Sequence, residues 1–179
     1  KTYPVFNRLL VIAIWVAMST YGQVSAQTPA PVSDAAQQQA RPVRVDEFLG
    51  AYLPTDLTFQ DHNGKTVTSA SLLANGKPTI LTFVYYRCPA ACTLLLNGLT
   101  EALNPHDFRL GKDFNLVTIS VDARETMELA SAKRKTYIDQ LPQNQEHDPQ
   151  AWRFLTGSRS AIESITNAVG YRFVYNPDS

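Results

Sequence analysis

Hydrophobic residues follow two kinds of pattern in this chain, and each kind predicts a different element. Residues 79–86 (TILTFVYY) and 114–121 are continuous runs rich in β-branched and aromatic side chains, typical of strands buried on both faces. Leu95, Leu99 and Leu103 instead recur at four-residue steps, which places an apolar stripe along one face of a helix. We therefore expect residues 79–86 to form a central strand that a helix follows directly.

Similar patterns extend over the rest of the domain. They predict an entry hairpin around Asn63-Gly64, a second helix, a short strand, a third helix ended by Gly170 and a last strand, at residues 57–67, 124–141, 152–156, 158–170 and 171–175. Strands that alternate with helices require a sheet covered by helices on both sides. The predicted fold class is therefore α/β, with a central β-sheet flanked by helices and an N-terminal hairpin.

The N-terminal part has a different composition. Two basic residues precede an apolar run at residues 9–18, and small residues follow it up to Ala26, which is the layout of a secretory signal peptide. The run is shorter than the roughly 20 residues that a membrane span needs, so a retained anchor is the weaker alternative. We expect residues 1–26 to be a signal peptide, residues 27–43, rich in Gln, Ala and Pro, to be a flexible linker, and residues 44–179 to be one domain.

Charge does not identify a partner. The 16 basic residues balance the 16 acidic ones, so no overall field would steer the protein towards nucleic acid or an anionic membrane. We therefore predict no nucleic-acid partner, and the candidate chemistry rests on the two cysteines.

Both cysteines lie in the segment YYRCPAAC, between the strand at 79–86 and the helix after it. Pro89 suits the first position of a helix, which predicts Cys88 at the helix cap and Cys92 one turn inside. A helix N-terminus and the neighbouring Arg87 both favour a thiolate, so Cys88 is expected to be the more acidic thiol.

Three uses of these thiols remain open at this point. Residues four apart on a helix have β-carbons about 5 to 6 Å apart, within reach of one metal ion and nearly of a disulfide. Zinc and iron–sulfur clusters usually take about four protein ligands, and the chain has no other cysteine, so copper is the best metal. A redox pair is equally compatible, whereas an inert disulfide would close a very small loop and stabilise the fold little.

No other residue type gives a comparable signal. The three histidines are interpreted as exposed loop residues, since no spacing marks one as a ligand; they are His62, His106 and His147. The aromatic residues near the cysteines, Phe83, Tyr85 and Tyr86, are expected in the core or the wall of the site. The nearby acids Asp122 and Glu125 are expected in a loop or at a helix start. The basic run Lys133-Arg134-Lys135 is expected on a solvated helix face.

Several separate blocks resemble the Sco/SenC family in order and spacing over residues 45–175: TFVYYRCPAAC, GKDFNLVTISVDARET, WRFLTG and AVGYRFVY. The resemblance implies a thioredoxin-like fold and a location that is periplasmic or on the outer face of the inner membrane. It also implies copper binding and a role in building the copper centre of cytochrome c oxidase. In that family the motif cysteines, here Cys88 and Cys92, hold copper and also cycle as a disulfide.

The sequence departs from the family in two places. Ala90-Ala91 and Thr93 stand where many members have Asp-Val and Pro, which is expected to alter copper affinity or thiol potential. The resemblance places the family's histidine ligand after the strand that matches residues 171–175. The third copper ligand is therefore expected beyond Ser179, in a C-terminal part that this sequence does not include.

The leading hypothesis is an exported copper metallochaperone that binds copper through Cys88 and Cys92. Its expected partners are the copper-centre subunit of cytochrome c oxidase and other copper chaperones or thioredoxin-like reductants. The alternative is a thiol-disulfide oxidoreductase that reduces the cysteines of that subunit, with Cys88 as nucleophile and Cys92 as resolving thiol. A thiol peroxidase is disfavoured, because no Thr stands two residues before a Pro-flanked cysteine.

Overall fold

The structure, a computed structural model, describes residues 44–103, 108–141 and 150–174. All of them belong to one compact unit formed by residues 41–179. The predicted signal peptide and linker lie outside the described residues and stay predictions. None of the helices in the described ranges has the length and apolar character that a membrane span requires.

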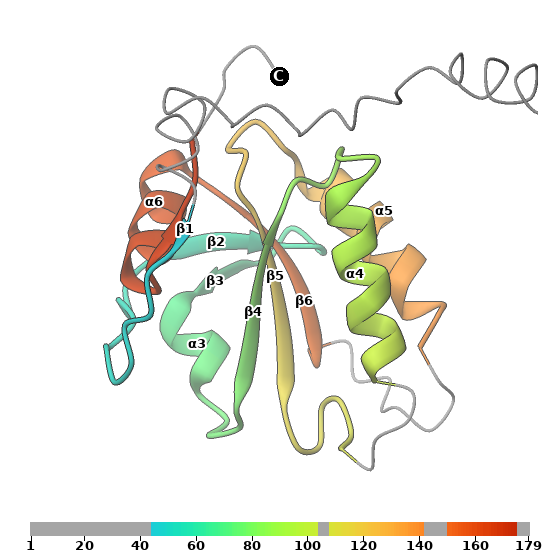
Figure 1. Cartoon of the computed structure of the whole chain (residues 1–179), viewed down its shortest axis with the longest axis horizontal. Coiled ribbons are helices and arrows are strands. Elements are labelled where there is room, and N and C mark those ends of the chain that lie inside the picture. The colour runs from blue at the N-terminus through green and yellow to red at the C-terminus, as the bar shows by residue number, and fades with distance from the viewer. Residues whose placement is uncertain (1–43, 104–107, 142–149, 175–179) are drawn as a thin grey trace, which may run out of the picture. The chain divides into compact units, whose positions relative to one another are not determined.

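The core of the unit is a five-stranded mixed sheet with the strand order β3-β2-β6-β5-β4 (Figure 1). Strands β4, β5 and β6 run parallel, and β2 is antiparallel to both β6 and β3. The strands are β2 (Thr58–Asp61), β3 (Thr66–Thr68), β4 (Thr79–Val84), β5 (Asn115–Ser120) and β6 (Trp152–Gly157). A separate antiparallel ribbon pairs β1 (Arg44–Val45) with β7 (Tyr171–Arg172).

Helices cover both faces of this sheet, as the alternating pattern predicts. Helices α4 (Ala91–Ala102) and α5 (Met127–Ile138) lie on one side, and α3 (Ser69–Leu73) and α6 (Arg159–Ala168) on the other (Figure 1). All six residues of β5 are buried, and alternate side chains enter different cores. Leu116 packs in the cluster that includes Leu96 of α4, and Val117 in the cluster that includes Ile165 of α6.

The expectation that residues 79–86 form a central strand is wrong. Among the described residues β4 pairs only with β5 and is an edge strand, and Ile80 is 44% exposed. Part of the run is covered by another element instead of by a neighbouring strand: the ring of Tyr171, from the β1–β7 ribbon, stacks on Phe83 at a centroid distance of 5.0 Å. The strand also ends at Val84, so Tyr85 and Tyr86 belong to the following turn.

The other predicted elements are present, with bounds that differ by one to three residues. The hairpin forms between β2 and β3, and Gly64 has a φ of 76°, which glycine adopts without strain. Gly170 follows α6 with a φ of 71°, and a β-carbon there would lie 1.7 Å from the carbonyl oxygen of Asp46. The second helix starts at Met127 rather than at residue 124, because Arg124 and Glu125 lie in the turn that leaves β5.

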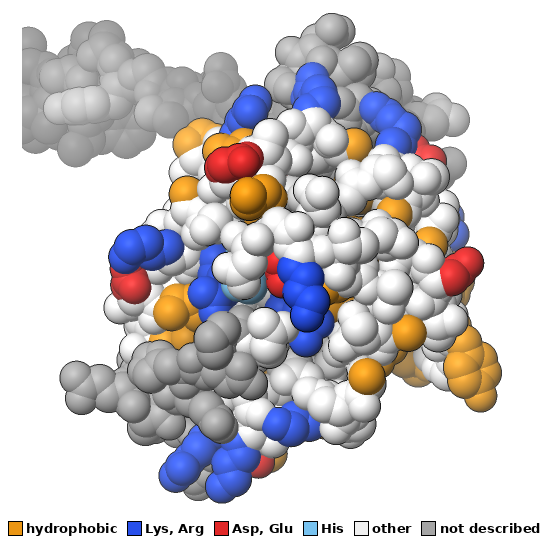
Figure 2. Space-filling view, turned by 180° about the vertical axis from the view of Figure 1, so that it is seen from behind, with side chains coloured by type: hydrophobic (Ala, Val, Ile, Leu, Met, Phe, Trp, Pro, Cys, Tyr) orange, Lys and Arg blue, Asp and Glu red, His pale blue; other side chains and the backbone are white. Residues whose placement is uncertain are grey.

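Charged groups do not gather by sign on the surface seen from behind. On the described part of that face, basic and acidic side chains both occur among neutral ones (Figure 2). This distribution agrees with the balanced composition of the chain.

Candidate functional site

The two cysteines lie where β4 ends and α4 begins, but not at the positions that Pro89 suggested. Helix α4 starts at Ala91 with Ala90 as its cap residue, so Cys88 lies in the preceding loop and Cys92 in the first helical turn. The prediction that Cys88 caps the helix is therefore wrong. The reason is a tight turn: the Cys88 N–H donates to the carbonyl oxygen of Tyr85 at 3.3 Å, which delays the helix.

Both thiols are free and partly exposed. Hydrogen bonds from the backbone N–H groups of Cys92 and Ala90 lower the pKa of Cys88, since these donors stabilise a thiolate at the start of the helix. Burial raises the pKa of Cys92, and the neighbouring Cys88 raises it further. Cys88 is therefore the more acidic thiol, as expected, although backbone donors rather than the Arg87 charge cause the difference.

The two thiols lie close enough to change each other's pKa: the interaction with Cys92 lowers the pKa of Cys88, and the interaction with Cys88 raises that of Cys92. Cys92 Sγ also accepts the N–H of Tyr85 at 3.3 Å. The loop and the helix start thus bring both sulfur atoms to one place.

Residues from α5 and β7 surround Cys92. The charge of Lys133 lowers the pKa of Cys92, and its Nζ lies 3.3 Å from Thr93 Oγ1. Burial, followed by the negative charge of Cys92, raises the pKa of Tyr171; burial is also the main cause of the raised pKa of Tyr137, and the charge of Cys92 adds to it. A lysine and two phenols therefore lie close enough to this sulfur to interact with its charge.

The basic run on α5 is not uniformly solvated, which corrects the expectation for it. Lys133 faces the thiol site, and Arg134 Nε donates to the carbonyl oxygen of Trp152 at 2.8 Å. Only Lys135 is exposed, in an ion pair with Asp139 at 2.6 Å. The interpretation fails because neighbouring residues on a helix point in different directions.

Glu125 is the functional candidate that sequence reasoning missed. Its side chain is buried, with 5% of the residue exposed, and its carboxylate accepts the backbone N–H groups of Tyr86 and Arg87, both at 2.8 Å. Asp122, by contrast, is a loop acid as predicted and pairs with Arg124 at 2.9 Å. The available signal was position, because the carboxyl ends of parallel strands β4 and β5 meet at the same edge of the sheet.

The aromatic residues lie as predicted, in the core or the wall of the site. Tyr86 is buried, and its hydroxyl donates to the carbonyl oxygens of Leu155 and Thr118. Phe83 packs against the second core cluster, and Tyr85 is half-buried.

His62 is buried, which corrects the expectation that it is an exposed loop residue. It is 5% exposed, and Nδ1 accepts the Phe154 N–H at 3.5 Å. Burial, with help from the Arg134 charge, lowers its pKa to about 4. His106 and His147 lie outside the described residues, and within the described ranges no three His, Cys, Asp or Glu side chains group as a metal site.

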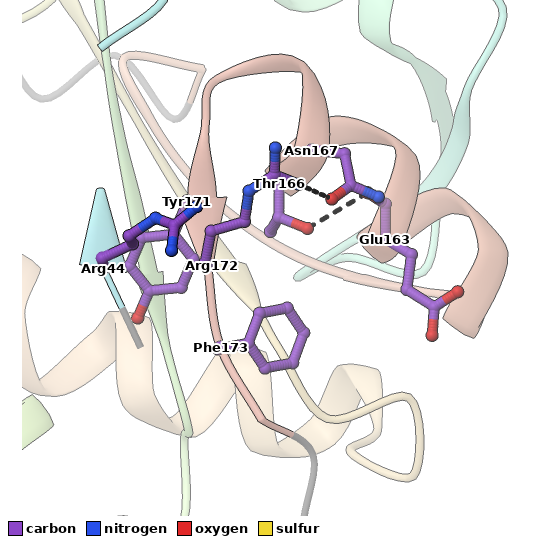
Figure 3. A pocket seen from close by; sticks show the side chains of 7 residues that line it. All are labelled: Arg44, Glu163, Thr166, Asn167, Tyr171, Arg172 and Phe173. Carbon is purple, nitrogen blue, oxygen red and sulfur yellow. Dashed lines mark hydrogen bonds between the residues drawn. The ribbon is translucent and has the colours of Figure 1, made fainter. Parts of the chain in front are cut away.

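A pocket of about 340 Å³ lies beside the ribbon and α6 (Figure 3). The cysteines do not line it, but Tyr171 does, so this residue connects the pocket to the wall of the thiol site. The two guanidinium groups that line the pocket already have partners: Arg172 bonds to Asp46 and Asn167, and Arg44 bonds to Asp46. The pocket therefore adds no second reactive group.

Comparison with known proteins places these features in a family. The family model described as SCO1/SenC matches residues 49–179. No curated protein matches the sequence.

Solved structures of similar fold support this match. A candidate electron transfer protein from Aquifex aeolicus VF5 has 29% identity and a TM-score of 0.58, covering 73% of this chain and 77% of that one. Arabidopsis thaliana ScoI with copper bound has 27% identity and a TM-score of 0.53, covering 71% and 73%. BsSco, described as a Sco-family cytochrome c oxidase assembly protein with a disulfide switch, has 25% identity and a TM-score of 0.50, covering 74% and 72%.

These neighbours confirm the thioredoxin-like fold, with its central sheet flanked by helices. The family model extends over most of the chain and includes the loop that carries both cysteines. The chain belongs to the SCO1/SenC family.

Proposed function

We propose that this protein is an exported copper carrier that holds copper between Cys88 and Cys92 and helps to assemble the copper centre of cytochrome c oxidase. Family membership supports the proposal, as do a copper-bound relative, ScoI, and an oxidase assembly relative, BsSco. The observation that carries it is the presence of two free, partly exposed thiols in the loop before α4 and in its first turn.

The chemistry of this pair suits Cu(I). Thiolates are soft ligands, and two of them satisfy a low-coordinate Cu(I) ion. Binding requires both sulfurs to lose their protons: backbone N–H groups favour the Cys88 thiolate, and Lys133 favours the Cys92 thiolate. An exposed site with few ligands also permits transfer, because each copper–sulfur bond that breaks here is replaced by one to an acceptor thiolate, without any redox change.

A third ligand is part of the proposal but lies outside the described residues. His62 is buried against β6 and already accepts a backbone N–H, so it is unsuited to the role. By its resemblance to the family, the chain is expected to use a histidine encoded beyond Ser179. Reading the gene past that codon tests this expectation, and a stop codon there would leave a two-thiolate site.

The thiol-disulfide oxidoreductase is the second candidate, and the unequal thiols favour it. A Cys88 thiolate would attack the disulfide of an acceptor and form a mixed disulfide with it. Cys92 would then attack the Cys88 sulfur and release the acceptor as a dithiol, which has gained two electrons, leaving a Cys88–Cys92 disulfide that has lost the same two electrons. An exposed nucleophile of lowered pKa beside a more buried thiol of raised pKa is suited to these two steps.

A copper titration separates the two candidates. The reduced protein is titrated with Cu(I) in competition with a chelator, beside a variant that carries both Cys88→Ser and Cys92→Ser. We expect one tight equivalent in the protein and none in the variant. If the protein binds no copper tightly while both thiols still react with a thiol reagent, and it reduces an acceptor disulfide, the oxidoreductase replaces the copper carrier.

Export has its own test. We expect N-terminal sequencing of the mature protein to begin at Gln27, after cleavage following Ala26. A mature N-terminus that still includes Trp15 would contradict cleavage and favour a retained anchor.

A further inference from the structure

We propose that Glu125 is a positioning residue for the dithiol, because its carboxylate fixes the turn that holds Cys88 against the start of α4. This inference rests on the proposed function of Cys88 and Cys92 as the reactive pair. It assigns to Glu125 no contact with copper or with an acceptor protein.

The carboxylate holds two successive peptide groups of the turn. Oε2 accepts the N–H of Tyr86 and Oε1 accepts the N–H of Arg87, both at 2.8 Å. Ser120 Oγ donates to Oε2 at 2.6 Å, which orients the carboxylate from β5. Each oxygen therefore has a donor, and the burial of Glu125 strengthens these charge-assisted bonds.

The turn that Glu125 holds touches both cysteines. At one end the Tyr85 N–H donates to Cys92 Sγ at 3.3 Å. At the other end the Cys88 N–H donates to the carbonyl oxygen of Tyr85, also at 3.3 Å, and Thr93 Oγ1 donates to the carbonyl oxygen of Cys88 at 3.2 Å. Glu125 binds the backbone of Tyr86 and Arg87, the two residues between these ends. A change at Glu125 therefore reaches Cys88 through the backbone.

Tyr86 shows that the turn is held in a fixed place. Its N–H is bound by Glu125, and its ring is buried with the hydroxyl bonded to the carbonyl oxygens of Thr118 and Leu155. Without the carboxylate the ring would stay in the core, whereas the peptides after it would lose their acceptors. The part of the turn that loosens is therefore the part that leads to Cys88.

Geometry and charge predict different effects when Glu125 becomes a glutamine. If the carboxylate acted only through its charge, its removal would leave the turn in place. If it positions the turn, its removal loosens the backbone at Tyr86, Arg87 and Cys88, and the amides of these residues lose protection.

The test uses the reduced, metal-free protein and the variants Glu125→Gln, Glu125→Asp and Glu101→Gln. Hydrogen exchange is measured in each protein at the amides of Tyr86, Arg87 and Cys88, which are the two amides that Glu125 binds and the amide of the cysteine that the turn holds. Glu101→Gln is the matched control, because Glu101 is an exposed acid of α4 and the change in charge is the same.

We expect the amides of Tyr86, Arg87 and Cys88 to exchange about tenfold faster in Glu125→Gln, because bonds to a charged acceptor are lost. Glu125→Asp, which keeps the charge but is one methylene shorter, should raise the exchange rates by less. Glu101→Gln should match the unchanged protein at all three amides.

A folded Glu125→Gln whose Cys88 amide exchanges as slowly as in the unchanged protein overturns the inference. If that variant does not fold, Glu125→Asp decides by whether its Cys88 amide exchanges faster than in the unchanged protein. Because no metal is present, the result is independent of copper: a protein that fails the copper titration can still show the Glu125 effect, and a protein that binds copper can lack it.

Discussion

The burial of His62 leads to a pH-dependent stability whose size follows from its pKa. The folded protein holds this pKa at about 4, chiefly through burial, against an ordinary value of 6.5. The unfolded chain therefore binds a proton at His62 at a pH where the folded chain does not. A lowered histidine pKa contributes stability that is full above the unfolded pKa and is lost as the pH falls from 6.5 towards 4.

The linkage relation gives a loss of about 2 kcal/mol between pH 7 and pH 5, and about 3 kcal/mol by pH 4. The interval from pH 7 to pH 5 is the informative one. Below pH 5, the carboxyls of Asp46 and Glu128 begin to bind protons, and this also lowers the free energy of unfolding. Hydrogen bonds to neighbouring side chains lower the pKa values of both groups in the folded protein.

The assay is urea unfolding of the protein and of His62→Gln at several pH values across this interval. Glutamine does not titrate, and its amide oxygen is able to accept the Phe154 N–H that His62 Nδ1 accepts. We expect the variant to be less stable at pH 7 and to lose much less stability on going to pH 5, so the two curves converge. Equal losses of free energy in both proteins would refute a buried, neutral His62.

Two further predictions use matched pairs of variants. Gly170→Ala should destabilise the fold more than Gly76→Ala in urea unfolding. Both residues have positive φ, which costs about 1–2 kcal/mol for alanine. Only at position 170 would the added β-carbon also clash with the carbonyl oxygen of Asp46 and break a hydrogen bond worth about 1 kcal/mol. Equal losses in the free energy of unfolding would show that the β1–β7 ribbon moves to accommodate the added methyl group. Lys133→Met should move the alkylation midpoint of Cys92 to higher pH, because a nearby positive charge is removed, whereas Lys135→Met should not; equal shifts would mean that only net charge matters.

Hydrophobic patterning predicts which segments of this chain are strands and helices, but not which strand is central. The run at residues 79–86 is as apolar as that at 114–121, yet β4 lies at the edge of the described sheet and β5 inside it. The pattern of apolar residues indicates that a side chain packs against other residues, but not which element of the fold it packs against. In β4 the cover for Phe83 is Tyr171, more than eighty residues later in the chain.

The burial of Glu125 and of His62 was missed for a related reason. The hydrogen bonds of Glu125 to the turn span 38 and 39 residues, and that of His62 to Phe154 spans 92. Local sequence gives a carboxylate near a helix start and a histidine near a tight turn, both of which are commonly exposed. Glu125 is buried because the parallel strands β4 and β5 end at the same edge of the sheet, and His62 because β2 pairs antiparallel with β6, and no local pattern encodes either pairing.

The two thiols are placed together but are not equivalent, and this difference bears on both candidate functions. Backbone N–H donors lower the pKa of Cys88, whereas burial and the neighbouring Cys88 raise the pKa of Cys92. The first attack on a disulfide needs only the Cys88 thiolate, whereas the resolving step and a two-thiolate copper site both require Cys92 to lose its proton. The charge of Lys133 favours that loss, so it assists copper binding and the resolving step. Removing this charge should therefore weaken copper binding and slow the release of a mixed disulfide more than it slows the first attack of Cys88, which makes Lys133→Met a variant that separates the role of Cys92 from that of Cys88.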